Sequence, residues 1–204
     1  TTTELYANAS DAAGNTSTCA GGLSYTNDST APAPPILLST APESPSSERR
    51  PIVLGTAEPG SVITFHLNAS CSSPVASNGS ADDSGAFEIK LIAPLPKNQT
   101  STIYATATDA AGNVSDCSTT SLVYVHDATA PTSPLLTKTE PGSPSNATTS
   151  PVVFGQASPG VPLVRIYLGK TCNTEAAVVV PEPDGSFSVA VDVPANTQSW
   201  FTAK

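Results

Sequence analysis

The sequence predicts an all-β fold made of tandem β-sandwich repeats, and three observations support this prediction. The chain has 20 Pro and 13 Gly in 204 residues, and these interrupt it so often that little room is left for helices. The blocks between them are rich in Val, Ile and Thr, residues that favour strands. Similar blocks return about 98 residues further along the chain, so the sheets that they form must repeat as well.

The repeat is clearest in a block of ten residues. YANASDAAGN at 6–15 returns as YATATDAAGN at 104–113, an offset of 98, and GTAEPG at 55–60 returns as GQASPG at 155–160. The joints are marked by DSTAP at 28–32 and DATAP at 127–131. These positions predict three parts: the C-terminal strands of a preceding repeat at 1–29, a complete repeat at 30–128, and a repeat lacking its last strand at 129–204.

Within the complete repeat, apolar residues mostly alternate with polar ones, the period of a strand with one buried face. Pro-Gly, Asp-Ser-Gly and Ala-Gly-Asn turns separate the blocks. The expected strands, in order, are 36–39, 52–57, 63–67, a weak strand near 74–79, 87–91, 103–107 and 122–124. Seven strands in about 98 residues is the count of an Ig-like or fibronectin III-like β-sandwich.

Charge and composition exclude several classes of function. The formal net charge is −9, with only eight Lys and Arg, so no electrostatic footprint for nucleic acid or an anionic membrane is present. No apolar run approaches the ~20 residues that span a bilayer, so no membrane insertion is expected. Four Cys, few Lys and abundant Ser, Thr and Pro are typical of an exported chain, and we expect a segment of a longer extracellular protein.

We expect no enzyme activity and no cofactor. A Gly-x-Ser-x-Gly elbow, a His-x-x-x-His pair and a phosphate loop are all missing from the sequence. The two histidines, His66 and His126, fall in expected strands, with His66 on the outward phase. We therefore expect both histidines to be surface residues.

The cysteines predict a structural disulfide. Cys71 and Cys117 lie in the complete repeat, and closing their loop is worth about 4 kcal/mol in the chain-entropy model. Zinc is the competing interpretation, but the four Cys lack the C-x₂-C spacing of zinc sites. The bridge is either internal, if 68–80 folds back toward 117, or it joins one repeat to the next, and we favour the internal pairing. Cys19 and Cys172 lack their repeat partner in this chain, so each is expected to be free or bonded to another chain.

Acidic turn residues raise calcium as a further hypothesis. Asp109, Asn113 and Asp127 offer hard oxygen ligands near turns, but calcium needs six to eight oxygens. The alternative is that these side chains stabilise their own turns by bonding the backbone, and we favour it.

Eight of the ten asparagines begin an Asn-x-Ser/Thr triplet. In a host with N-glycosylation these would be acceptor sites, and otherwise they are polar turn residues, which we favour. They are Asn8, Asn15, Asn27, Asn68, Asn78, Asn98, Asn113 and Asn146.

The runs GTAEPGSVITF, DSGAF, YATATDAAGNVS and DATAP, in this order, resemble the bacterial Ig-like (Big) repeats of large secreted adhesins and surface proteins. The resemblance covers the whole chain. It is nearest to a Cys-containing subgroup, in which one Cys follows the strand after the Pro-Gly turn and another follows the Gly-Asn turn, as Cys71 and Cys117 do. It implies an extracellular or cell-surface array whose internal repeats act as spacers.

Two functions of different classes follow. The first is a structural spacer or filament segment, such as an adhesin stalk or fibre. The second is a glycan- or protein-binding module, which should carry aromatic or charged clusters on its loops. The loops consist of Ser, Asn, Gly and Ala in every unit, and Trp200, the only Trp, falls in an expected strand. The sequence therefore favours the spacer and identifies no host or surface ligand.

The incomplete repeat also predicts partners. Residues 1–8 align with 197–204 at an offset of 196, and Cys19 then supplies the partner that Cys172 lacks. A sandwich without its last strand has an open edge that invites strand addition. We expect the edge to be filled by a neighbouring repeat of the same chain, or by the start of another copy, so that copies meet end to end.

Overall fold

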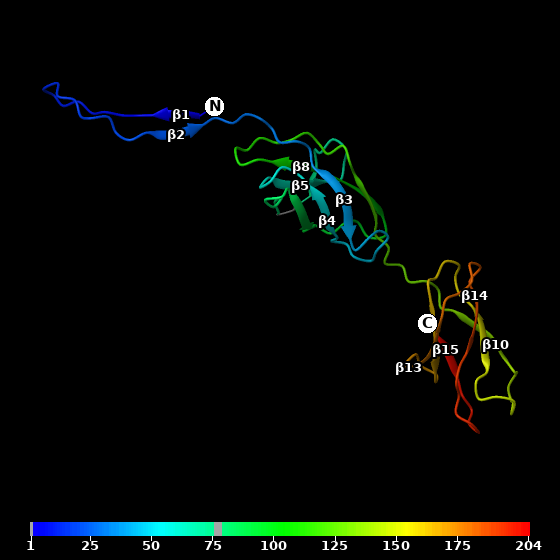
Figure 1. Cartoon of the computed structure of the whole chain (residues 1–204). Coiled ribbons are helices and arrows are strands. Elements are labelled where there is room, and N and C mark those ends of the chain that lie inside the picture. Colours follow the sequence, from blue (N-terminus) through cyan, green and yellow to red (C-terminus); the bar gives the residue numbers. More distant parts are fainter. Residues whose placement is uncertain (1, 76–78) are drawn as a thin grey trace. The chain divides into compact units, whose positions relative to one another are not determined.

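The computed structural model of the protein describes residues 2–75 and 79–204. The chain divides into two compact units, Thr1–Ala128 and Thr129–Lys204. Within the described residues the structure contains fifteen strands and no helix, as the all-β prediction requires (Figure 1). Accordingly, none of the described residues belongs to a helix that is long and apolar enough to cross a membrane.

A seven-stranded sandwich forms the larger part of the first unit (Figure 1). Its strands are β3 (Ile36–Ala41), β4 (Ile52–Thr56), β5 (Val62–His66), β6 (Pro74–Val75), β7 (Ala86–Lys90), β8 (Thr100–Thr108) and β9 (Leu122–Val125). One sheet has the order β3-β4-β7 and the other β6-β5-β8-β9, with antiparallel pairing throughout. This is the Ig-like, fibronectin III-like arrangement that the strand count predicted. The weak strand near 74–79 is seen at Pro74–Val75, and 76–78 lie outside the described residues.

The core of this sandwich lies between its two sheets. Alternate residues of each strand point inward, and the rings of Phe65 and Phe87 meet across the core with centroids 6.2 Å apart. Leu67, the last residue of the expected strand 63–67, lies just beyond the end of β5 and is 37% exposed. The buried core residues are Leu37, Val53, Ile63, Phe65, Phe87, Ile89, Leu91, Leu95, Ile103, Ala105, Ala107 and Tyr124.

Close packing against β3 and β7, the two neighbours of β4 in its sheet, requires a glycine at position 55. A Cβ atom on Gly55 would lie 2.4 Å from the carbonyl oxygen of Ile36 and 2.4 Å from Cζ of Phe87. Gly155 has the same relationship to Leu135 and Phe187 in the second unit. The repeated glycine is therefore needed for space beneath the aromatic ring rather than for backbone freedom.

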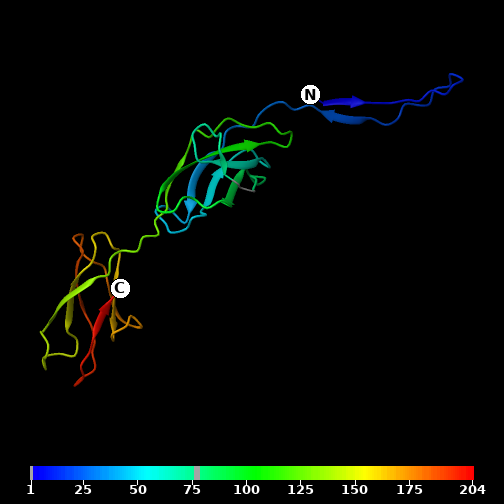
Figure 2. The ribbon, with the colours of Figure 1, turned by 180° about the vertical axis from the view of Figure 1, so that it is seen from behind.

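The second unit has six strands in two sheets (Figure 2). They are β10 (Leu135–Glu140), β11 (Val152–Gln156), β12 (Val164–Leu168), β13 (Thr174–Val179), β14 (Ser186–Ala190) and β15 (Phe201–Ala203). The sheet orders are β10-β11-β14 and β13-β12-β15, so β15 occupies the edge where β8 of the first unit has a further neighbour, β9. Trp200, expected within a strand, immediately precedes β15.

Residues 2–26 form a two-stranded hairpin of their own, β1 (Thr2–Leu5) with β2 (Leu23–Thr26). Leu5 pairs with Leu23 in this hairpin, just as Ile103 pairs with Leu122 between β8 and β9. The two hairpins therefore share one register. Every described residue from 2 to 29 is exposed.

Candidate functional site

The disulfide between Cys71 and Cys117 is the main covalent feature of the sandwich. The two Cα atoms are 5.7 Å apart, and the bond closes a loop with a sequence separation of 46. The bridge is internal to one repeat, which is the pairing that we favoured.

Both cysteines reach the same level of the sheet because the chain folds back twice toward Ala105. After β5 the chain turns, with Cys71 N donating to the Asn68 carbonyl, and the Cys71 sulfur ends 3.9 Å from the carbonyl oxygen of Ala105. After the turn that follows β8, the chain runs back along that strand, and Ser118 N donates to the same carbonyl over 2.8 Å. The two folded-back segments thus bring Cys71 and Cys117 together.

The calcium candidates Asp109 and Asn113 form a turn. Asp109 Oδ1 accepts from the backbone amides of Ala111 and Asn113, and Oδ2 accepts from the Asn113 side chain at 2.8 Å. The bond to the Asn113 side chain is the main reason that the pKa of Asp109 lies below its ordinary value. Asp127 lies beyond β9, where its amide donates to Ser46. Among the described residues, no group of three or more His, Cys, Asp or Glu is placed to hold a metal ion.

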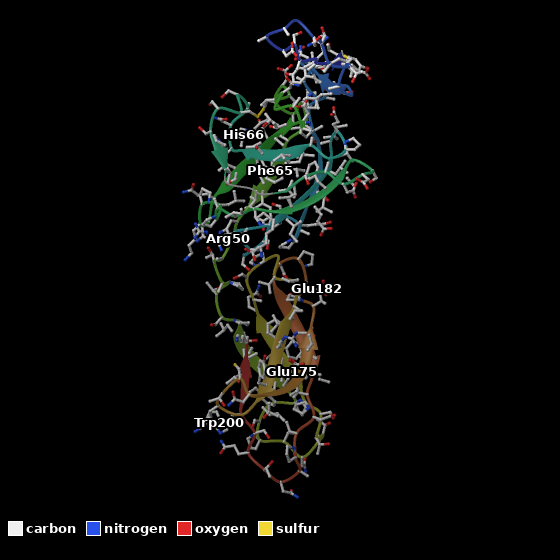
Figure 3. All side chains as sticks on the ribbon, turned by 90° about the vertical axis from the view of Figure 1, so that its left-hand side faces the viewer. Arg50, Phe65, His66, Glu175, Glu182 and Trp200 are labelled. Atoms are coloured by element: carbon white, nitrogen blue, oxygen red, sulfur yellow. A yellow bond between two sulfur atoms is a disulfide. The ribbon has the colours of Figure 1, made fainter. Side chains whose placement is uncertain are left out.

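The expectation that both histidines lie on the surface is wrong. His66 is 5% exposed and His126 is 2% exposed (Figure 3 labels His66 beside Phe65 on β5). His66 Nε2 lies 3.1 Å from the Thr106 hydroxyl, and Thr106 is itself buried. Alternation correctly places His66 on the outward face of β5. Beyond Leu67, however, the chain folds back toward Ala105, next to Thr106. This face of β5 is therefore not open to solvent at His66. Burial lowers the pKa of His66.

His126 belongs to a polar corner at the end of β9. Its Nδ1 accepts from the Asn98 amide at 2.8 Å, and its Nε2 donates to the Ser47 carbonyl at 3.1 Å, so the proton is on Nε2. The hydroxyl of Tyr124 donates to the Glu48 carbonyl at 2.8 Å. We call residues 44–48 together with 124–127 the β9 corner.

Backbone groups complete the β9 corner. The Val125 amide donates to the Ser44 hydroxyl at 2.8 Å, and the Val125 carbonyl accepts from the Ser46 amide at 3.0 Å. Asp127 N then donates to the Ser46 carbonyl at 2.9 Å, and Ser46 and His126 form a parallel bridge. The last strand of the repeat is thus joined to the Pro-Ser segment that follows the first strand.

The other two cysteines are free and exposed. Cys172 Sγ lies 4.0 Å from the carbonyl oxygen of Ala203, the residue that corresponds to Ala105. Cys19 lies between Ser17, whose amide donates to Ala9, and Ala20, whose amide donates to Ala7. Each half of the disulfide site therefore exists without its partner in a different part of the chain.

The second unit has an open groove of about 790 Å³ where the first unit has its β9 corner. The groove is lined by residues from two stretches, 139–151 and 193–201. Ser143 and Ser145, in its wall, correspond to Ser44 and Ser46 at an offset of 99. The groove is thus the site that Tyr124 and His126 fill in the first unit.

The Asn-x-Ser/Thr asparagines lie at or near the surface where they are described. Asn8, Asn15, Asn27, Asn98 and Asn146 are exposed, Asn68 and Asn113 are partly buried, and Asn78 lies outside the described residues. Several have structural roles, since Asn68 closes the turn before Cys71 and Asn98 accepts from the Ala128 amide at 2.9 Å. Their glycosylation stays a prediction.

The comparison with known families agrees with this geometry, because a family model described as "Bacterial Ig domain" matches residues 41–127. Residues 41–127 are a bacterial Ig domain. The matched range contains both cysteines of the disulfide and all of the β9 corner, so these features lie within a single bacterial Ig domain.

One solved structure similar to the chain is described as "Biofilm associated protein - BSP domain". The two share 17% identity with a TM-score of 0.25, and the match covers 74% of this chain and 24% of that chain. The present chain thus spans about a quarter of that relative. No curated protein matches the chain.

The β9 corner is the feature of the bacterial Ig domain that sequence reasoning missed. Two signals in the sequence point to it. The PxSPS pattern at 42–46 returns at 141–145, and Tyr124 returns as Tyr25. Their repetition marks the polar segment and the aromatic residue as parts of the repeated structure.

Proposed function

We propose that the chain is a structural spacer or filament segment of an extracellular, cell-surface repeat protein. The observation that supports this most strongly is the way in which the first and last strands of the seven-stranded sandwich, β3 and β9, are joined. The Leu37 amide donates to the Thr120 hydroxyl at 2.8 Å near the start of both strands. The β9 corner joins their far ends, with the parallel bridge between Ser46 and His126. We call this set of contacts the terminal clamp.

The direction of the terminal clamp determines how it responds to tension. The chain enters the domain at the start of β3 and leaves it after β9, and the two clamped segments run parallel. A pull on the two chain ends is therefore directed along the strands in opposite senses. Such a load shears several hydrogen bonds together instead of opening them one at a time, which is the property that a load-bearing spacer needs.

The disulfide supports the same role. The bond between Cys71 and Cys117, at a sequence separation of 46, closes a loop in the middle of the domain. This loop limits how far the chain can extend once the clamp has opened. Disulfides persist in oxidising, extracellular compartments, so the bond also supports the proposed location outside the cell.

The alternative is a glycan- or protein-binding module, and one observation favours it. Trp200 is 52% exposed, and Lys170 Nζ lies 4.6 Å from the centroid of its ring (Figure 3). An exposed aromatic residue beside a cation is a common feature of recognition surfaces. This surface belongs to the second unit and has no counterpart in the first, where Thr102 takes the place of Trp200 at an offset of 98.

One measurement tests the proposed location, and a second separates the two functions. An antibody raised against the chain should label intact cells of the source organism, as a cell-surface spacer requires, and labelling only after lysis would contradict the proposed location. On a glycan array, the spacer predicts no saturable binding by the chain. Micromolar hits that disappear in Trp200→Ala would favour the binding module instead.

A further inference from the structure

One edge strand of the second unit carries exposed apolar side chains. β13 is the outer strand of the sheet β13-β12-β15 and pairs on one side with β12 (Figure 1). Among the described residues, no strand pairs with its other side. Val178 is 46% exposed, and Val180, just beyond the end of the strand, is 74% exposed. The unpaired N–H and C=O groups of such an edge are a template for a further strand.

Little in β13 blunts this edge. Natural edge strands are commonly protected by short length, by Pro or by unpaired charges. β13 has six residues, no Pro and a single charged residue, Glu175 (labelled in Figure 3). The Glu175 carboxylate already forms an ion pair with Arg165 of β12. The edge therefore combines free backbone groups with a strand that is mostly apolar.

The corresponding edge of the bacterial Ig domain has a different sequence. Its edge strand is β6, which begins with Pro74, a residue that has no N–H to donate. The sequence that follows Val75 is ASNGS at 76–80, whereas the second unit has AVVV at 177–180. The repeat thus folds without an apolar run at this edge, so the exposed valines are particular to the second unit.

A second copy of the same strand has the sequence that this edge requires. Antiparallel pairing of two β13 strands is symmetric, so Val178 and Val180 of each copy lie beside those of the other, and such cross-strand pairs stabilise a sheet. Lys170 precedes the strand and Glu182 follows it, and both are exposed. An antiparallel partner therefore places Glu182 of one copy at the same end of the pair as Lys170 of the other, so opposite charges meet at both ends.

We propose that the second unit binds a second copy of the chain through an antiparallel β13–β13 pair, which joins the two β13-β12-β15 sheets into one. The pair completes the backbone hydrogen bonding of both edges and removes Val178 and Val180 from water. The two copies run in opposite directions at this contact. The inference goes beyond the proposed spacer role, because a spacer can resist load without a lateral partner.

The first test is sedimentation equilibrium of the full chain over a range of concentrations. Cys19→Ser and Cys172→Ser are combined in every sample, so that no disulfide joins two copies. The chain should associate reversibly, and Val178→Lys should weaken the association at least roughly tenfold. Val123→Lys is the matched control, because Val123 is a 60% exposed valine on β9 of the first unit, and it should have little effect. A monomer at every concentration, or equal effects of the two variants, would overturn the proposal.

Hydrogen exchange then locates the contact. The amides of 174–180 should exchange at least roughly tenfold more slowly at a concentration where the chain is associated than at one where it is monomeric. The amides of β9 should exchange equally at both concentrations. Association with slower exchange only in other segments of the chain would overturn the proposal.

Exchange of charges tests the symmetry of the pair. Val178→Lys and Val178→Glu should each associate weakly alone, because the pair then brings like charges together. An equal mixture of the two variants should recover association, because the introduced charges are then opposite. Circular dichroism and the fluorescence of Trp200 check that each variant folds. A mixture that associates no better than its components would overturn the proposal, and none of these outcomes affects the force measurement of the spacer.

Discussion

The Tyr124 hydroxyl donates a hydrogen bond of 2.8 Å to the backbone carbonyl of Glu48, 76 positions earlier in the chain. The Tyr124 side chain is fully buried, so this bond joins the core of the last strand to the loop that precedes β4. A repeat therefore closes only when its final strand is in place. The same position in the second unit is an open groove.

Replacing Tyr124 with Phe should remove this bond and little else. The buried ring stays, and the Glu48 carbonyl loses its donor, so the free energy of unfolding should fall by about 1 kcal/mol. Urea denaturation followed by circular dichroism would measure the change. Tyr104→Phe is the matched control, because the Tyr104 side chain is half-buried and its hydroxyl donates to no described residue. Equal effects of the two variants would show that the corner bond contributes nothing specific.

Removing the disulfide should destabilise the bacterial Ig domain alone. In the double variant Cys71→Ser with Cys117→Ser, the segment between these positions, with a sequence separation of 46, is no longer closed into a loop. The unfolded chain therefore gains conformational entropy, and the free energy of unfolding should fall by about 4 kcal/mol. Trp200 is the only Trp and lies in the second unit, so its fluorescence reports that unit separately. The circular dichroism transition of the first unit should shift, while the Trp200 transition stays fixed. A shift of both transitions would show that the two units unfold together.

A methyl group at Gly55 should be poorly tolerated. In Gly55→Ala the added Cβ meets the Ile36 carbonyl oxygen and the Phe87 ring at 2.4 Å, and such overpacking typically costs about 1–3 kcal/mol. Gly142→Ala is the control, since no heavy atom lies within 4 Å of its added Cβ. Thermal melts of both variants would compare them. A Gly55→Ala melting temperature equal to that of the unmodified chain would contradict the packing described for β4.

Buried His66 should make stability depend on pH in the acidic range. Burial holds its folded pKa below the ordinary value of 6.5, so the unfolded chain binds this proton more tightly. The stability contributed by neutral His66 is complete above pH 6.5 and is lost as the pH falls from there through the lower, folded pKa. Urea midpoints measured across this range should fall less steeply in His66→Gln than in the unmodified chain. Identical slopes would mean that His66 is not a source of this dependence.

The sequence predicted the strands and the disulfide because both depend on local or repeated patterns. Alternation placed Ile63, Phe65 and Phe87 in the core. The same pattern returns in the corresponding strands of the other unit, which supports each strand a second time. The pairing of Cys71 with Cys117 followed from the number of cysteines in one repeat. The path that brings them together did not, since it depends on turns after β5 and β8 that reverse the chain.

The buried histidines and the β9 corner could not be predicted from alternation. The alternation of residues along a strand indicates which face of the strand a side chain occupies. It does not indicate whether a folded-back segment covers that face, as one does at His66. His126 is buried because it bonds to the Asn98 amide and the Ser47 carbonyl, groups that are distant in sequence. Contacts of a side chain with distant backbone atoms leave no periodic signal.

The spacer account is tested most directly by pulling the oxidised chain by its two ends in a single-molecule force experiment. The terminal clamp predicts that the bacterial Ig domain yields in one abrupt step. The extension in that step should increase by about 160 Å when Cys71 and Cys117 are reduced, because the loop between them, with a sequence separation of 46, is then free to extend. Ser44→Ala should lower the rupture force, since it removes the acceptor of the Val125 amide, whereas Ser47→Ala should not. Gradual extension at low force, without an abrupt step, would contradict the account.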